Sequence, residues 1–484
     1  MIESENIDHY KGADMDRHTK SNGSRGAFSS RLGFVLAAAG SAVGLGNIWR
    51  FPYLAARDGG GLFLVIYIIL ALTFGFTLLT TEVAIGRKTG ESPLTAYAAL
   101  KKGWGPLGYI ACLIPMVIMP YYCVIGGWVL KYLTVYATGS GEAAAADGYF
   151  AGFITSQWGP LIFMAVFMAL TAVIVILGVD TGIEKLSKVL MPALLVIIVI
   201  IAVFSLTISH TDDAGMTRNG LEGLTILFIP DLEGITVTQF LRVVMDAMGQ
   251  LFYSLSIAMG IMIAYGSYMP KDTDLSKSIN QIEIFDTAIA ILAGVMIIPT
   301  VFVFMGRDGM QASGPGLMFQ TLPRVFTAMG GFGWIIGVLF FAMVLFAAVT
   351  SSVSILEAIV SSIIDRFHIS RKAAVGFAVA ISFVLAVIVC LGYNVFYFDA
   401  PLPNGAVGQI LDIFDYISNN VLMPILSILT CILVGWIIKP EAVTDEVELG
   451  GAKMGRKGLY RIMVRFVAPI LLLILLLQAV GLIK

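Results

Sequence analysis

Residues 40–47 read Gly-Ser-Ala-Val-Gly-Leu-Gly-Asn, in the middle of the first long apolar run of the chain. Three glycines, a serine and an asparagine within eight residues make a poor helix. Because unpaired backbone groups are costly in hydrocarbon, a break at this depth persists only inside protein or around a bound ligand. The alternative explanation is small-residue helix packing of the Gly-x-x-x-Gly type, which residues 40–44 fit.

A second break in the sequence weakens that alternative. Residues 254–260 read Ser-Leu-Ser-Ile-Ala-Met-Gly, in an apolar run five spans later. Paired interruptions in corresponding places of two halves are typical of a binding site between inverted repeats. We therefore predict that residues 31–209 form a first repeat (spans 1–5) and residues 210–438 a second (spans 6–10), with spans 1 and 6 broken.

The composition supports this membrane interpretation. Of the 484 residues, 58% are hydrophobic and 13% are charged, and the mean hydropathy is +0.89, whereas a globular domain has about 25% charged residues. A soluble domain is excluded, and an all-α polytopic membrane protein is predicted. The net charge of -2 offers no basic excess for nucleic acid. Runs of about 20 apolar residues give eleven spans, centred near Gly44, Leu72, Val124, Val166, Val199, Leu255, Leu292, Val344, Ala380, Leu426 and Leu471.

The distribution of basic residues predicts the orientation. With the N-terminus inside, the inner segments, counted with Arg31, hold 22 Lys and Arg, against 4 in the outer loops. We expect a disordered cytoplasmic tail at residues 1–30, a cytoplasmic loop and span 11 at residues 439–484, and an outside C-terminus. The chain would be a multi-pass protein of the cell's inner (plasma) membrane, with no obligate protein partner evident. The four cysteines lie in apolar runs without Cys-x-x-Cys spacing, so we expect them buried and reduced.

Ionisable residues inside spans are the other costly feature, at about 2.5–3.5 kcal/mol each on insertion scales. Glu82, Asp286 and Glu357 are the candidates at membrane depth. We interpret Glu82 as a solvated or packed helix end near the cytoplasm. Asp286 has no basic neighbour in sequence, so a bound cation is its expected partner.

Several motifs together identify a resemblance. Arg-Leu-Gly-Phe at 31–34 is followed by Gly-Ser-Ala-Val-Gly-Leu-Gly-Asn-Ile-Trp-Arg-Phe-Pro at 40–52 and by three glycines at 59–61. Further matches are Tyr-Tyr at 121–122, Gly-Gln-Leu-Phe-Tyr-Ser-Leu-Ser at 249–256 and Thr-Ser-Ser at 350–352. In this order, over residues 25 to about 465, the chain resembles the neurotransmitter:sodium symporters, whose bacterial members have the LeuT-type fold. The resemblance implies a 5+5 inverted repeat plus an eleventh helix, and sodium-coupled amino-acid symport by alternating access.

The resemblance also implies two sodium sites. The first would use the Ala42 carbonyl, Asn47, Ser254 and Asp286, completed by the substrate carboxylate. The second would use the carbonyls of Gly40, Val43 and Ala347 and the hydroxyls of Thr350 and Ser351. All of these groups are oxygens, as a hard cation prefers. Read alone, the hydroxyls at 350–352 would more often bond back to the preceding helical turn.

One substrate site is implied between these ions. Its carboxylate would meet the Leu45 and Gly46 amides and the Tyr122 hydroxyl, and its amino group would meet carbonyls near Ser41. The full expected set is Ser41, Ala42, Leu45, Gly46, Ile118, Tyr122, Tyr253, Ser256, Met259, Ser351 and Ile355. Because the side-chain walls are apolar, we expect a hydrophobic or aromatic L-amino acid. Ser41 and Ala258 depart from the leucine-binding pattern and leave open glycine, a small aliphatic amino acid or a compatible solute.

Two ion pairs would act as gates. Arg50 with Asp415 would close the outside above a Tyr253 lid, and Arg25 with Asp365, supported by Tyr268, would close the inside. Arg25 could instead be only one of the positive-inside residues. Gly182 and Pro192, with nine residues between them, resemble the family's unwinding motif for a water path to the second sodium, although an ordinary helix entry and proline kink would look the same.

Chloride is not expected as a cofactor beside the two sodium ions. Tyr67, Gln250 and Ser254 match positions associated with the anion, but Ala290 lacks a hydroxyl and Asp286 stands where the family more often has asparagine. The chain thus brings its own negative charge. Rival functions have less support, because there is no pore-lining ring of charges for a channel and no hydrolase or metalloprotease motif for an intramembrane enzyme.

Overall fold

The computed structural model describes residues 26–212, 215–232 and 235–483, so most of the predicted tail and Arg25 lie outside the described residues. Within these ranges, nine continuous helical segments are long and apolar enough to cross a bilayer. A tenth span is the bent pair 31–42 and 46–57, whose halves meet at 52°. The remaining predicted span, span 6, is also broken, into α13 (Val237–Ser254) and α14 (Ile261–Ser267). Each predicted centre thus lies in one of these spans or in the break of one.

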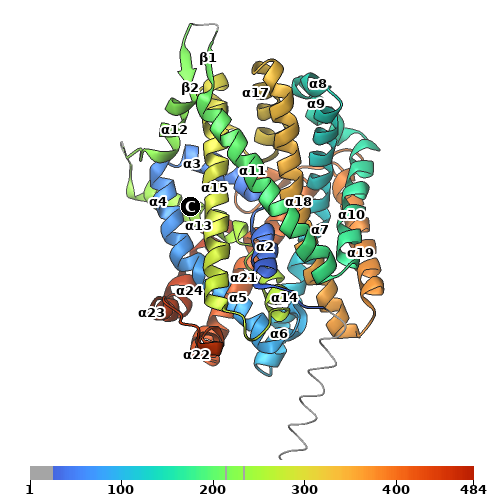
Figure 1. Cartoon of the computed structure of the whole chain (residues 1–484), viewed down its shortest axis with the longest axis vertical. Coiled ribbons are helices and arrows are strands. Elements are labelled where there is room, and N and C mark those ends of the chain that lie inside the picture. The colour runs from blue at the N-terminus through green and yellow to red at the C-terminus, as the bar shows by residue number, and fades with distance from the viewer. Residues whose placement is uncertain (1–25, 213–214, 233–234, 484) are drawn as a thin grey trace, which may run out of the picture.

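The long helices run side by side along the molecule (Figure 1). Their bounds, in chain order, are α2 (Arg31–Ala42), η1 (Gly46–Arg50) and α3 (Phe51–Arg57) for span 1; α4 (Gly61–Leu70), η2 (Ala71–Gly75) and α5 (Phe76–Thr89) for span 2; α7 (Pro106–Ala137), α10 (Gly159–Ile176), η3 (Val179–Glu184) with α11 (Lys185–Thr207) for spans 3–5; α13 and α14 for span 6; α15 (Leu275–Met305), α18 (Gly331–Phe367) and α19 (Arg371–Leu391) for spans 7–9; α20 (Ile410–Asp415), η6 (Tyr416–Leu422), α21 (Met423–Ile432) and η7 (Leu433–Ile437) for span 10; and α23 (Lys457–Ile462), η9 (Met463–Val467) and α24 (Ala468–Ala479) for span 11.

Short elements occupy the two ends of the bundle. One end carries α6 (Pro93–Leu100), α22 (Glu441–Val447) and η8 (Leu449–Gly451). The opposite end carries α8 (Gly141–Ala145), α9 (Tyr149–Thr155), α12 (Gly220–Phe228), η4 (Asp308–Gln311), α16 (Gly314–Gly316), η5 (Leu317–Thr321) and α17 (Leu322–Ala328). Successive loops thus lie at alternate ends of the bundle, which agrees with the predicted assignment of loops to two sides of the membrane.

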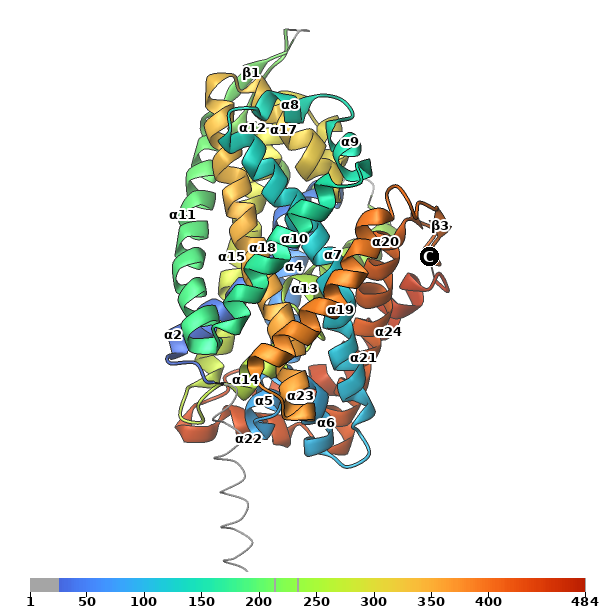
Figure 2. The ribbon, with the colours of Figure 1, turned by 90° about the vertical axis from the view of Figure 1, so that its right-hand side faces the viewer.

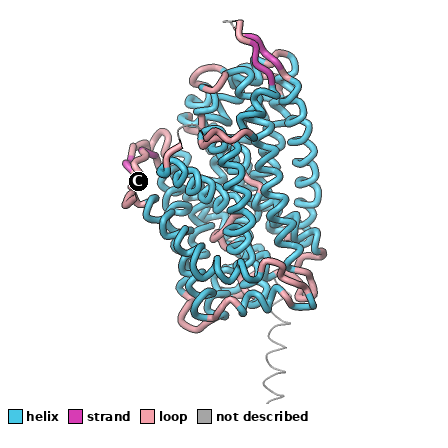
Figure 3. Tube along the Cα trace, turned by 90° about the vertical axis from the view of Figure 1, so that its left-hand side faces the viewer, coloured by secondary structure: helices cyan, strands magenta, loops and turns pink. Residues whose placement is uncertain are grey.

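The extended structure within the described ranges is limited to two small antiparallel hairpins and one isolated bridge between Gly60 and Pro230. Strand β1 (Ser209–Thr211) pairs with β2 (Thr217–Asn219), with His210 opposite Arg218, and β3 (Ala400–Pro401) pairs with β4 (Val407–Gly408). Both hairpins lie in loops at the periphery (Figure 3). They leave the helical core unchanged.

The broken spans lie inside the bundle. Helix α2 packs against α11, α15 and α18, and α14 packs against α5. The degree of burial distinguishes central helices from peripheral ones. In the most apolar stretch of α7, 78% of the residues are buried, whereas in that of span 11 only 22% are buried. Helices α10 and α19 form one outer face (Figure 2). All four cysteines are free and buried, as predicted.

Local sequence explains where the helices begin. Ser30 caps α2 by accepting a hydrogen bond from the Gly33 amide at 3.0 Å, and Asp274 caps α15 through the Lys277 amide at 3.0 Å. Thr236 and Gln239 form a reciprocal capping box at the start of α13. These caps fix the first turns of three helices that carry the site.

The break in span 6 has an unusual backbone. Ser256 (φ 52°) and Ala258 (φ 63°) both lie in the left-handed region, which costs a residue with a Cβ about 1–2 kcal/mol. The Ser256 amide donates to the Tyr253 carbonyl at 3.1 Å, and the Ala258 amide donates to Glu82 Oε1 at 2.7 Å. One hydrogen bond to the end of α13 and one to the Glu82 side chain of span 2 therefore hold Ser256 and Ala258 in place.

Candidate functional site

The two breaks meet at a narrow cavity of about 20 Å³ in the middle of the bundle. All eleven residues predicted to bind substrate line it, together with Gly44, Asn47, Ser254 and Ile261. They come from spans 1, 3, 6 and 8, so only the tertiary fold brings them together. None of these lining residues carries a charged side chain.

One polar group in this cavity lacks a well-formed hydrogen bond. The Tyr122 hydroxyl is buried close to the Ser351 side chain and the Leu45 backbone, but it makes no hydrogen bond of normal geometry with any described residue. The outer half of span 1 resumes at Leu45 and Gly46, where the first backbone amides of a helix lack partners within it. A hydroxyl and a helix N-terminus at one cavity suit an anionic group such as a carboxylate.

Gly46 cannot carry a side chain here. A Cβ at this position would lie 2.7 Å from the Tyr253 ring. The ring of Tyr253 therefore packs directly on the backbone at the start of the outer half-helix.

Serine hydroxyls join the two breaks at the cavity wall. Ser256 Oγ donates to the Ser41 carbonyl at 3.0 Å, and Ser351 Oγ donates to the same carbonyl at 3.2 Å. This carbonyl, expected to receive the substrate amino group, thus lies at the junction of spans 1, 6 and 8.

The structure brings together the side chains predicted for the first sodium. Asp286 Oδ1 accepts from Asn47 Nδ2 at 2.8 Å and from Ser254 Oγ at 2.7 Å, and all three residues are buried. Ser254 Oγ also lies 3.2 Å from Asn47 Oδ1. Ala42 lines the adjacent cavity. A carboxylate, an amide oxygen, a hydroxyl and a carbonyl are ligands that suit sodium.

Three members of the second predicted set, Gly40, Thr350 and Ser351, meet between α2 and α18. Ser351 Oγ lies 3.4 Å from the Gly40 carbonyl, and a Cβ on Gly40 would lie 3.2 Å from Thr350 Cβ. Thr350 Oγ1 bonds back to the Phe346 and Ala347 carbonyls at 3.0 and 3.1 Å. Val43, the fifth member, follows the last residue of α2. Among the described residues no cluster of His, Cys, Asp and Glu suggests a transition metal.

The groups associated with chloride are engaged within the protein. Tyr67 donates to Asp286 Oδ2 at 3.4 Å, Ser254 donates to Oδ1 of the same carboxylate, and Gln250 Nε2 donates to the Gly46 carbonyl at 3.1 Å. Asp286 therefore accepts from two of these three donors.

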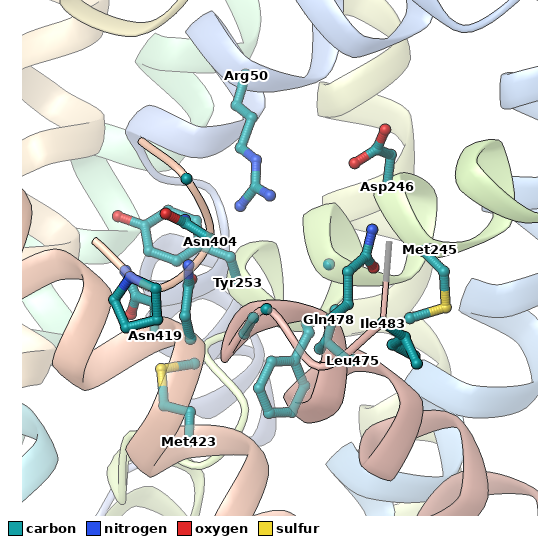
Figure 4. Close-up of a pocket in the computed structure, with 17 residues that line it drawn as sticks. Arg50, Met245, Asp246, Tyr253, Asn404, Asn419, Met423, Leu475, Gln478 and Ile483 are labelled. Carbon is teal, nitrogen blue, oxygen red and sulfur yellow. The ribbon is translucent and has the colours of Figure 1, made fainter. Parts of the chain in front are cut away.

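An open outer cavity of about 580 Å³ lies above Tyr253, which lines both spaces. Figure 4 shows the Arg50 guanidinium pointing into it, with Asp246 and Asn419 on opposite sides. The predicted outer pair is not closed in this structure, because Asp415 makes no salt bridge with Arg50 and instead accepts from Asn419 Nδ2 at 2.6 Å. Its gating role stays a prediction.

At the other end, the predicted Arg25–Asp365 pair cannot be assessed, because Arg25 lies outside the described residues. Asp365 accepts from the Ser92 amide at 2.8 Å. The Tyr268 hydroxyl donates to Glu357 Oε1 at 2.6 Å, and Arg371 forms a salt bridge with Glu357. The pairing of Glu357 with Arg371 was not anticipated from sequence.

A second inner contact was also missed. Glu184 accepts from the Ser29 amide (2.7 Å), Ser29 Oγ (2.6 Å) and Ser30 Oγ (2.8 Å), and Lys188 lies 2.7 Å away. We call this contact between η3 and the start of α2 the inner latch. Gly33 permits it, since a Cβ there would lie 2.0 Å from Glu184 Oε1. An acid between the predicted unwinding residues Gly182 and Pro192 was the available sequence signal.

The sodium:neurotransmitter symporter family model matches residues 25–140 and 155–484. A Bacillus subtilis protein described as the uncharacterized sodium-dependent transporter YhdH is 33% identical over 465 residues, covering 94% of this chain and 98% of its own length. The human sodium- and chloride-dependent GABA transporter 2 is 24% identical over 481 residues, covering 88% of this chain and 75% of its own. The crystal structure of MhsT in complex with L-phenylalanine superposes with a TM-score of 0.81 at 36% identity, covering 94% of this chain and all of MhsT.

Proposed function

Because the chain belongs to the sodium:neurotransmitter symporter family, and is therefore a sodium-dependent multi-pass membrane transporter rather than an enzyme, we propose that it takes up a hydrophobic or aromatic L-amino acid without needing chloride. The fold is the LeuT type, with an eleventh span. The observation that carries the substrate proposal is the Tyr122 hydroxyl, which lacks a well-formed hydrogen bond, at the amide end of a broken helix, in a cavity whose lining residues are uncharged.

The chemistry of the residues that line the cavity supports this substrate class. A carboxylate at Tyr122 and the Gly46 amide would place the amino group toward the Ser41 carbonyl. The side chain would then meet Ile118, Met259 and Ile355. Methionine adapts its shape to different apolar partners, which suits a range of side chains. MhsT, which covers nearly the whole chain in the comparison, was crystallised with L-phenylalanine.

Two oxygen clusters support coupling to two sodium ions. The cluster around Asp286 would hold the first ion beside the substrate carboxylate, and the cluster of Gly40, Thr350 and Ser351 would hold the second, with Val43 and Ala347 completing it. One sodium moving inward releases about 2.3 kcal/mol per 100 mV, plus about 1.4 kcal/mol for each tenfold gradient. Two ions give roughly 7 kcal/mol, enough for a concentration ratio on the order of 10⁵.

The engagement of two anion-associated donors, Tyr67 and Ser254, by Asp286 supports independence from chloride. A fixed carboxylate beside two cations is stabilised in its charged form by their field. An external anion would add a second negative charge at the same place. The human relative, whose name includes chloride dependence, is a useful contrast for this feature.

Alternating access would use the proposed gates and repeats. The N-terminal tail would face the cytoplasm and the C-terminus the outside, as the excess of inner Lys and Arg favours. Residues 31–209 and 210–438 would be the two repeats. Arg50 with Asp415 would close the outside, whereas Arg25 with Asp365 and the inner latch would close the inside.

Purified protein in proteoliposomes tests this proposal. Binding of L-phenylalanine should require sodium, persist when gluconate replaces chloride, and be competed by tryptophan, tyrosine and leucine better than by glycine, lysine or glutamate. Tyr122→Phe, which removes only the hydroxyl, should weaken binding of every amino acid. Tighter binding of glycine or of a compatible solute would favour the small-substrate alternative, and binding without sodium would refute the proposal.

A further inference from the structure

Glu82 of α5 has no part in the functions described above, although it is buried at membrane depth. The residue is 5% exposed, so of the two expectations, a solvated or a packed helix end, burial excludes the solvated one. Oε1 accepts a hydrogen bond from the Ala258 amide at 2.7 Å. Oε2 has no hydrogen-bond partner among the described residues.

Glu82 differs from every other buried glutamate in the described part of the chain. The other four are each paired with a cation: Glu184 with Lys188, Glu283 with Arg456, Glu357 with Arg371, and Glu446 with Arg87. Glu82 forms no ion pair within those ranges. A buried charge without a partner is costly, and a carboxyl in such a place favours its neutral form.

The groups that face Glu82 do not supply a positive charge. Tyr97 on α6 and Cys431 on α21 are its titratable neighbours, and the Tyr97 hydroxyl lies 2.9 Å from Thr430 Oγ1. The adjacent Thr81 lies 2.9 Å from the Tyr460 hydroxyl of α23.

The other elements packed on α5 also keep their charged or titratable groups engaged elsewhere. On α14, Tyr265 donates to Ser354. On α22, Glu446 forms a salt bridge with Arg87 at the inner end of α5. On α15, the carboxylates of Glu283 and Asp286 bond to Arg456 and to Asn47, respectively.

Glu82 holds the strained part of the break in span 6. Ala258 lies at φ 63°, between Ser256 and Met259, which both line the substrate cavity. Helices α5 and α14 are in backbone contact, because a Cβ on Gly86 would lie 2.0 Å from the Ile263 carbonyl and one on Gly266 would lie 2.3 Å from the Val83 carbonyl. The carboxyl is therefore fixed in position relative to the break.

We propose that Glu82 is a proton-binding site whose neutral carboxyl positions the break of span 6 in the closed cavity. Ionised Glu82 requires water or a cation, so proton loss favours conformations in which the break opens to solvent. By linkage, closing the cavity around substrate takes up a proton, and raising the pH weakens substrate binding. Only the substrate arm of the test rests on the proposed function, because proton binding by Glu82 is measurable without transport.

Infrared titration of the full chain in lipid nanodiscs measures the proton directly. With carbon-13 label confined to glutamate, a protonated glutamate carbonyl band should persist from about pH 5 well into the neutral range, above the ordinary range of an exposed glutamate. The part of the band that persists into the neutral range should be lost in Glu82→Gln and kept in the control Cys431→Ala. Absence of this part from the unmodified protein, or its persistence at full intensity in Glu82→Gln, would overturn the proposal.

Sodium-dependent binding of L-phenylalanine measured against pH gives the functional readout. The affinity of the unmodified protein should fall with rising pH, by up to about tenfold per unit once Glu82 ionises in the open form. Glu82→Gln keeps an acceptor for the Ala258 amide but cannot ionise, so it should bind with a pH-independent affinity. Cys431→Ala should keep the pH slope. An unchanged slope in Glu82→Gln would refute the proposal. If that variant does not fold, the infrared band of the unmodified protein tests the proposal. Persistence of the band into the neutral range supports proton binding, and its absence refutes it.

Discussion

Replacing Glu184 with glutamine should release the inner latch. The carboxylate accepts three hydrogen bonds from Ser29 and Ser30 at 2.6–2.8 Å, at the N-terminus of α2. Glutamine has a similar size but offers one acceptor oxygen and an NH₂ group that faces donors. It also removes a negative charge from the positive end of the helix dipole. The variant therefore tests charge and acceptor capacity without creating a cavity.

The expected magnitude follows from the lost contacts. A hydrogen bond to a charged group is worth about 1.5–3 kcal/mol, and at least one such bond cannot be formed by the amide. A loss of about 2–3 kcal/mol lowers the ratio of inner-closed to inner-open protein roughly 30- to 150-fold. Apparent substrate affinity falls as the closed fraction falls.

Thiol accessibility reports the inner-open fraction. Ser267, a buried residue of α14, is the reporter position, because α14 packs against α2 and Ser→Cys is a small change. Labelling of Ser267→Cys by a polar maleimide should accelerate in the Glu184→Gln background and slow again with sodium and phenylalanine. Lys188→Gln is the matched control, since this half-exposed partner contributes about 1 kcal/mol or less. Equal labelling rates with and without Glu184→Gln would refute the latch.

Three further outcomes are expected of the site. Asp286→Asn should cripple uptake by removing the charge beside the first sodium, with recovery in chloride when Ala290→Ser is added; full activity of the single variant without chloride would contradict this assignment. Thr350→Ala with Ser351→Ala should abolish coupled uptake by removing two oxygens from the second ion, and an unaltered sodium dependence of uptake would show that the site lies elsewhere. Gly46→Ala should lower phenylalanine affinity at least about tenfold, because its methyl group would lie 2.7 Å from the ring of the lid; isothermal titration would show wild-type affinity if the lid could move aside.

Local properties of the sequence were enough to predict the spans and the position of the cavity. Apolar length gave each span, because a bilayer of fixed thickness requires about 20 residues per helix. Glycine and serine at 40–47 and 254–260 marked the two breaks, because backbone that is not helical must be satisfied inside protein at that depth. Motif resemblance then named the cavity residues, and all eleven line one space in the structure.

Which side chains of different spans contact one another was decided only by tertiary packing. Glu82 follows a polar pair of threonines and precedes the basic end of span 2, so sequence favoured a helix end near the cytoplasm, whereas the fold buries it against Ala258, 176 residues later. Glu184 reaches Ser29 across 155 residues, and Glu357 is shared by Tyr268 and Arg371. Neither hydrophobic periodicity nor residue spacing specifies which faces of distant helices meet. Whether a buried carboxyl finds a cation, a helix N-terminus or a single backbone amide depends on that packing, and this determines which carboxyl can act as a latch and which can hold a proton.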